Sequence, residues 1–120
     1  MIIIRSEQYS KFEEEAWRDF LQRTIEHLRQ DMSDHIVGLS DEQLKKRIAS
    51  SVELAGTYGL LNEYEVVCFL DAGLLLNDER FPENPKCRPI CSILQDKTLA
   101  PDERAEQTLI LAFQQVLIVK

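Results

Sequence analysis

Apolar residues recur at helical spacing from the first part of the chain onward. Between Ser6 and about Met32 they return every three or four positions, and charged residues occupy the opposite side. This period is typical of an amphipathic helix, so we expect one long helix over this range. Its apolar stripe comprises Tyr9, Phe12, Ala16, Phe20, Thr24 and Leu28, widened by Trp17, Leu21 and Ile25.

Two later helices are indicated by the residues at their ends. Ser40 with Gln43, and Asn62 with Glu65, have the spacing of a capping box, in which each side chain bonds the other's backbone N–H. Gly59 suits the left-handed position after a helix. A helix between Ser40 and Gly59 has Leu44, Ile48, Val52 and Ala55 as its apolar face, joined by Ser51 and Tyr58.

The helix expected over residues 62–76 is apolar on nearly every side from Val66 to Leu76. A helix of this kind is favourable only when other elements surround it, so we expect it at the centre of the fold. A polar loop over Asn77–Pro85 follows and contains Phe81. A short helix over Lys86–Asp96 then has Pro89 in its first turn.

The last helix is expected to begin at Pro101, because proline suits the first helical position and Asp102 and Glu103 suit the helix dipole. Its expected buried face is Leu109, Ala112, Phe113, Val116 and Leu117. The sequence therefore predicts an all-α fold, a single domain over residues 1–120 with about five helices around a central apolar helix. Ile2–Ile4 fit either a short extended segment or an apolar lead-in to the first helix.

Charge and composition narrow the function. The net charge is −7, which argues against a nucleic-acid-binding surface. Residues 62–84 hold six carboxylates and one arginine, and so contribute five of the seven net charges. This acidity fits a solvated surface or a surface that attracts a basic partner. The apolar runs are too short for a signal peptide or a membrane span, so a cytoplasmic location without membrane contact is expected.

Asp71 stands out because its helical neighbours Val67, Cys68, Leu74 and Leu75 are apolar. Burying an ionised carboxylate is unfavourable unless it is paired. We therefore expect Asp71 to meet an arginine, a lysine or backbone N–H groups inside the fold, or to reach water at one edge. The alternatives are a contact with a partner or an active-site acid.

The sequence contains no recognisable catalytic constellation, and we expect no enzymatic activity, metal or cofactor. Cys87 and Cys91 lack the spacing of zinc and redox motifs, and Cys68, His27 and His35 add no ligand pattern. The candidate contact residues are instead protein-binding ones. They are Phe81 in its acidic loop, with Asp71, Asp78, Glu79 and Glu83, and the apolar groups Trp17 and Val116–Val119. Phe81 fits an interface anchor and a plug of the helix bundle equally well.

A set of short segments distributed along the chain is distinctive: Ile3–Gln8 with Phe12-Glu13, Ala55–Leu60, Glu63, Val66, Phe69, Leu74–Asp78, Phe81, Pro85 and Ile93-Leu94. Together they resemble a family of small all-helical proteins from bacterial type VI secretion effector clusters. Nearly the whole chain is covered, but most matching positions are core or turn residues. The chain differs from the family at Cys87–Cys91 and at Asn77-Asp78, where a glycine is usual.

The resemblance implies an accessory role in which the protein holds a secretion effector or the chaperone of that effector. The resulting hypothesis is a non-enzymatic adaptor or co-chaperone that binds another protein. The alternative is an immunity protein that neutralises a toxin, because an acidic surface would suit a basic toxin face.

Overall fold

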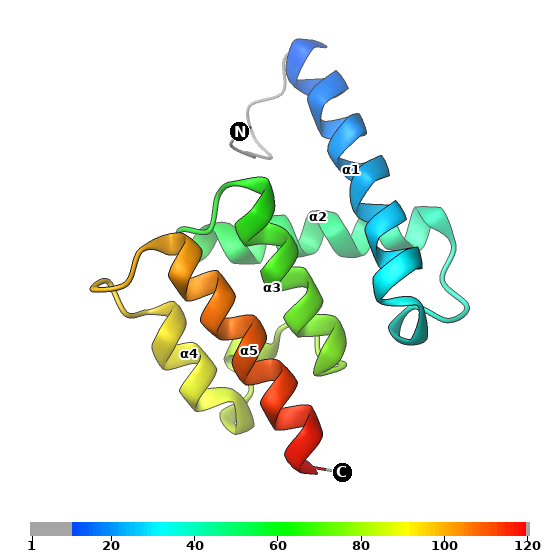
Figure 1. Ribbon diagram of the computed structural model, residues 1–120. Coiled ribbons are helices and arrows are strands. Elements are labelled where there is room, and N and C mark those ends of the chain that lie inside the picture. Colours follow the sequence, from blue (N-terminus) through cyan, green and yellow to red (C-terminus); the bar gives the residue numbers. More distant parts are fainter. Residues whose placement is uncertain (1–10, 120) are drawn as a thin grey trace.

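The computed structural model describes residues 11–119, and the side chains of residues 14–117. The segment Ile2–Ile4 and the beginning of the helix expected from Ser6 lie outside the described residues. Every regular element in the described part is helical, so the all-α prediction is confirmed. The five α-helices are α1 (Lys11–Asp31), α2 (Asp41–Thr57), α3 (Glu63–Leu75), α4 (Arg88–Leu94) and α5 (Pro101–Val119), with short 3-10 turns at Ser33–His35, Phe81–Glu83 and Pro85–Cys87 (Figure 1).

Both expected capping boxes form. The Ser40 hydroxyl accepts a bond from Gln43 N at 3.2 Å, and the Gln43 side chain accepts from Ser40 N at 2.9 Å. At the start of α3, Asn62 Oδ1 accepts from Glu65 N at 2.9 Å, and Glu65 Oε1 accepts from Asn62 N at 3.4 Å. These bonds satisfy amide groups that a helix start leaves without partners, which explains why α2 and α3 begin where the sequence predicts.

The ends of α2 and α3 share one geometry. Gly59 follows α2 with a φ of 78°, as predicted, and Asn77 follows α3 with a φ of 53°. In both turns this residue and its successor donate backbone bonds to carbonyls of the last helical turn. Asn77 therefore occupies the left-handed position that glycine usually takes, at a modest conformational cost.

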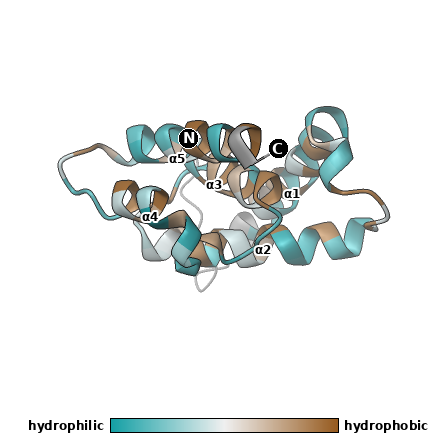
Figure 2. Ribbon diagram, turned by 90° about the horizontal axis from the view of Figure 1, so that it is seen from below, coloured by the Kyte–Doolittle hydropathy of each residue, from teal (hydrophilic) through white to brown (hydrophobic). Residues whose placement is uncertain are grey.

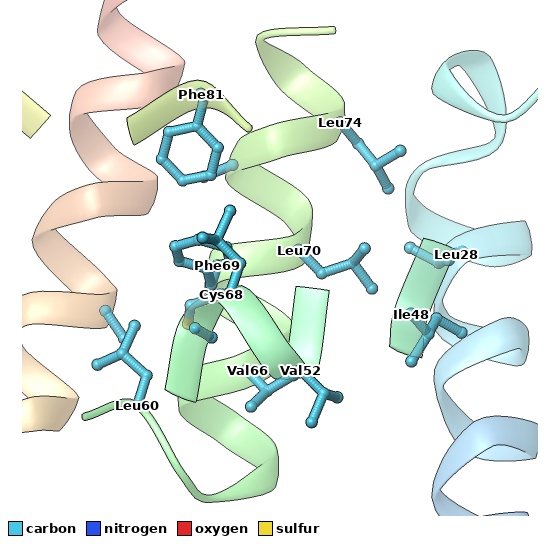
Figure 3. Packing of buried hydrophobic residues seen from close by; sticks show 14 of the residues in the cluster. Leu28, Ile48, Val52, Leu60, Val66, Cys68, Phe69, Leu70, Leu74 and Phe81 are labelled. Atoms are coloured by element: carbon cyan, nitrogen blue, oxygen red, sulfur yellow. The ribbon is translucent and has the colours of Figure 1, made fainter. Parts of the chain in front are cut away.

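The helix α3 lies at the centre of the fold, as its apolar composition predicts (Figure 1). In Figure 3, Leu70 and Leu74 point toward Leu28 of α1 and Ile48 of α2, while Phe69 lies on another side. In Figure 2, hydrophobic colouring covers much of α3. The buried apolar residues of α3 are Val66, Cys68, Phe69, Leu70, Ala72 and Leu74.

The helices form a flattened arrangement with principal extents of 43 × 36 × 20 Å. The helices α3 and α5 run side by side in the same direction (Figure 1). The helix α1 crosses α2 and diverges from it, and its N-terminal half projects past α2 in the same view. This divergence leaves an open cleft of about 600 Å³, with Leu21 and Ile25 of α1 among its lining residues.

A buried cation joins three of the helices. Arg104, in the first turns of α5, is 5% exposed. Its Nη1 donates to the carbonyl oxygens of Tyr58 at 2.8 Å and Leu94 at 3.0 Å. Tyr58 caps the C-terminus of α2, and Leu94 is the last residue of α4. Because helix C-termini carry partial negative charge, the guanidinium is compensated by two helix ends.

Candidate protein-binding surface

The acidic residues of segment 62–84 are spread over several places instead of forming one surface. Glu65 is buried and caps α3. Glu63 forms an ion pair with Arg23 of α1 at 2.5 Å. Asp71 is also buried. Half of the six carboxylates are therefore engaged within the fold, and the charge that the sequence concentrates in this segment is not available at one surface.

The other three carboxylates, Asp78, Glu79 and Glu83, lie in the loop between α3 and α4. Asp78 is partly buried and accepts bonds from Arg80 N and from the Asn84 side chain, both at 3.1 Å. Glu79 and Glu83 are exposed. The Glu83 carboxylate pairs with Arg80, whose hydrogen bond lowers the pKa of Glu83. The loop thus presents an acidic surface that Arg80 partly neutralises.

Phe81 folds back into the core. Its side chain has no exposed surface, and its ring centroid lies 4.8 Å from that of Phe69 (Figure 3). Gly73 makes room for it, because a Cβ at that position would lie 3.4 Å from the Phe81 ring and 3.3 Å from the Asp78 carbonyl oxygen. Of the two roles that the sequence allows, Phe81 therefore has that of a plug of the helix bundle, and its candidacy as a partner-facing anchor is corrected, because burial of the ring is favoured over exposure in a charged loop.

Asp71 is 7% exposed and meets a histidine from α1. His27 Nε2 lies 2.8 Å from Asp71 Oδ2 and 3.0 Å from Oδ1, and His27 Nδ1 lies 3.1 Å from Asp31 Oδ2. Burial raises the pKa of Asp71, and the hydrogen bond and charge of His27 oppose this effect without cancelling it. The buried carboxylate is therefore paired, as expected, but its partner is an imidazole.

This pair joins two helices and has no evident catalytic use. Both nitrogens of His27 face carboxylates, so neither is available to remove a proton from a substrate. A shallow cavity of about 240 Å³ lies beside the pair. Its lining is Phe20, Arg23, Thr24, His27, Glu63, Tyr64 and Val67, in which Arg23 and Glu63 are already paired with each other. We therefore assign His27 and Asp71 to the attachment of α1 to α3.

The cysteines are buried or partly buried thiols. Burial raises the pKa of the Cys68 thiol to about 11, and burial also raises that of Cys87. Cys91 is partly buried. A thiol must lose its proton to act as a nucleophile or metal ligand, so Cys68 and Cys87 are poorly suited to either. Within residues 11–119, no group of three or more His, Cys, Asp and Glu side chains is arranged to hold a metal ion.

The face that α5 turns to the core differs from the predicted one. Phe113 is 53% exposed and Leu117 is 64% exposed, although both were expected inside. The buried positions include two polar residues, Arg104 and Thr108, while Ala112 is buried as predicted. Apolar residues occur almost all round α5 between Leu109 and Phe113, so periodicity alone does not determine its rotation.

The exposed apolar residues of α5 form a row that we call the α5 stripe: Ile110, Phe113 and Leu117. Ile110 is 47% exposed, and the spacing places all three side chains along one face of the helix. Leu117 falls within the Val116–Val119 run that the sequence indicates as partner-facing, whereas Val116 is partly buried. Trp17, the other apolar candidate, is partly buried and its ring centroid lies 5.6 Å from that of Phe20.

An acidic end continues the α5 stripe toward the N-terminus of the helix. Asp102 and Glu106 lie eight and four positions before Ile110, on the same helical face, and both are exposed. Tyr64 of α3, 48% exposed, borders this end. Its pKa is raised first by the neighbouring Cys68 thiol, then by partial burial, and further by the charges of Glu106 and Asp102. The surface therefore consists of an apolar row with an acidic end.

Comparisons with protein-family models, with curated proteins and with solved structures found no match to this chain. Among the described helices, none has the combination of length and apolar character that crossing a bilayer requires. The candidate site is therefore defined by its geometry: an exposed apolar stripe on α5, next to Tyr64 and the carboxylates of Asp102 and Glu106.

Proposed function

We propose that this protein is a non-enzymatic adaptor or co-chaperone that binds another protein through the α5 stripe. The observation that carries the proposal is the exposure of Ile110, Phe113 and Leu117 in one row. About half of each side chain remains open to water, so its burial in an interface contributes about 1 kcal/mol. Three such contacts raise an affinity roughly a hundredfold.

The proposed setting is type VI secretion, with an effector or its chaperone as the partner. Its support is the resemblance of segments such as Ala55–Leu60 and Leu74–Asp78 to accessory proteins of effector clusters. Capture of partners from the native host, followed by mass spectrometry, tests this assignment. An effector or its chaperone should be recovered, and deletion of the gene should abolish secretion of that effector while the producing cells stay healthy.

Two substitutions test the surface itself. Leu117→Asp places a charge within the α5 stripe and should abolish capture of the partner. Val37→Asp is the matched control, because Val37 is an apolar residue that is 82% exposed in the loop after α1. Circular dichroism should show that both variants are folded. Equal capture by the Leu117→Asp variant and by wild type would reject the α5 stripe as the contact surface.

The alternative function is that of an immunity protein. The observation that favours it is the acidic end of the stripe, where Asp102, Glu103 and Glu106 are exposed and would attract a basic toxin face. Gene deletion distinguishes the two functions. Loss of an immunity protein poisons the producer or its sister cells, whereas loss of a co-chaperone leaves them viable and blocks secretion.

A further inference from the structure

We infer that the α5 stripe receives an amphipathic helix of the partner, with lysine or arginine residues at the end that lies over Asp102 and Glu106. This inference rests on the proposed function, since it concerns the same surface. It adds the conformation and the charge of the segment that binds there.

The helical conformation follows from the shape of the surface. From Asp102 to Leu117 the face is straight and about 23 Å long at the rise of an α-helix. The apolar side chains follow helical spacing, so a second helix lying alongside can place its own apolar residues between them. Residues 11–119 contain no β-strand with which an extended peptide could form backbone hydrogen bonds, so a partner must be recognised through side-chain contacts.

The basic charge of the partner helix is inferred from the acidic residues of α5. Between Pro101 and Leu117 the charged residues are Asp102, Glu103, Arg104 and Glu106, and Arg104 is buried. The exposed charges of this face are therefore all negative. Arg23, which lies with Tyr64 around the cavity between α1 and α3, is already paired with Glu63. A cation of the partner would therefore complement Asp102 and Glu106 without competing with another cation on the face of α5.

A second copy of this chain fits the face less well. In a parallel pair of α5 helices the carboxylates of the two copies would face each other, which is unfavourable. In an antiparallel pair only the apolar row would be shared, and the acidic end of each copy would extend past Leu117 of the other. With a net charge of −7, the chain also repels its own copies at long range.

The test uses three synthetic helical peptides of about fifteen residues, long enough to follow the stripe. The first has leucines at i, i+3 and i+7 and two lysines at one end. The second has glutamates in place of the lysines, and the third is a scrambled form of the first. Binding is measured by fluorescence anisotropy at low and high salt. We expect the lysine peptide to bind at least about tenfold more tightly than the other two, and its binding to weaken as salt increases.

A charge exchange makes the test specific to this surface. Glu106→Lys should weaken binding of the lysine peptide and strengthen binding of the glutamate peptide. Glu53→Lys, at an exposed position of α2, makes the same change in net charge and should leave the affinity for both peptides unchanged. Equal effects of the two substitutions, or equal binding of the lysine and scrambled peptides, would overturn the inference. A dimer in light scattering that Leu117→Asp dissociates would also overturn it, because a second copy would then be the occupant.

The result also separates this inference from the function on which it rests. If capture of the native partner depends on Leu117 and is unchanged by Glu106→Lys, the inference of a basic partner helix is wrong and the proposed function stands. If Leu117→Asp leaves capture intact, the proposed function itself fails.

Discussion

Replacement of Arg104 by methionine should destabilise the fold more than any change to a surface cation. Methionine is similar in length and apolar, but it donates no hydrogen bond. The carbonyl oxygens of Tyr58 and Leu94 would then lose the donor that they share. The Leu94 carbonyl would be left buried and that of Tyr58 partly buried, each at a helix C-terminus whose dipole the guanidinium now compensates.

The loss of stability expected for Arg104→Met can be worked out from these two hydrogen bonds. A hydrogen bond from a charged donor contributes about 1.5–3 kcal/mol, and two are lost. Removal of the buried charge recovers part of this, because the desolvation of Arg104 is no longer required. We expect a net loss of about 2–4 kcal/mol in the free energy of unfolding, equivalent to a fall in Tm of roughly 10–15 °C for a domain of this size.

Urea denaturation followed by far-UV circular dichroism measures the effect. Arg18→Met, at an exposed position of α1, is the control and should change stability little. Arg104→Lys keeps the charge without the planar fork and should fall between wild type and Arg104→Met. Stability of Arg104→Met equal to that of Arg18→Met would refute the reasoning, because the two carbonyl bonds would then contribute nothing.

Three further predictions concern α3 and the loop that follows it. Burial raises the pKa of Asp71, so the native state favours the protonated form and the ionised form becomes a stability penalty as pH rises through that pKa. The stability of Asp71→Asn relative to wild type should therefore increase in urea titrations as pH rises from the ordinary aspartate pKa through the raised pKa of Asp71. A stability difference that does not change with pH would contradict this. Asn77→Gly should stabilise the protein by up to about 1 kcal/mol, because a φ of 53° suits glycine better; an unchanged Tm in calorimetry would show that Asn77 is not strained. Phe81→Ala should destabilise by about 3–5 kcal/mol, whereas a surface anchor would show almost no loss in the same measurement.

The helix ends were predictable because their determinants are local. Ser40 with Gln43, and Asn62 with Glu65, form their bonds within four residues of each other, so the sequence contains both partners. The central position of α3 was also predictable, because a helix that is apolar on all sides buries its surface only when other elements surround it. That Asp71 needed a partner followed from its neighbours as well.

The remaining features depend on contacts between distant segments. The sequence allows Phe81 to be either exposed or buried, and only its contacts with Gly73 and Phe69 decide between the two. The rotation of α5 buries Arg104 against two acceptors that are 46 and 10 residues away in the chain. No local pattern identifies a buried arginine in a first turn that also contains Asp102 and Glu103. The α5 stripe could not be found for the same reason, since its exposure follows from that rotation.

The attachment of α1 has a consequence for how the molecule opens. Its N-terminal half projects past α2, and its links to α3 include the partly exposed pairs of Arg23 with Glu63 and His27 with Asp71. By contrast, Arg104 joins α5 to the ends of α2 and α4, and Phe81 packs against Phe69 of α3. Opening of α1 exposes less buried surface than global unfolding, so amide protons of α1 should exchange with solvent before those of α3. We therefore expect α2 to α5 to unfold as one cooperative block and α1 to detach from it first.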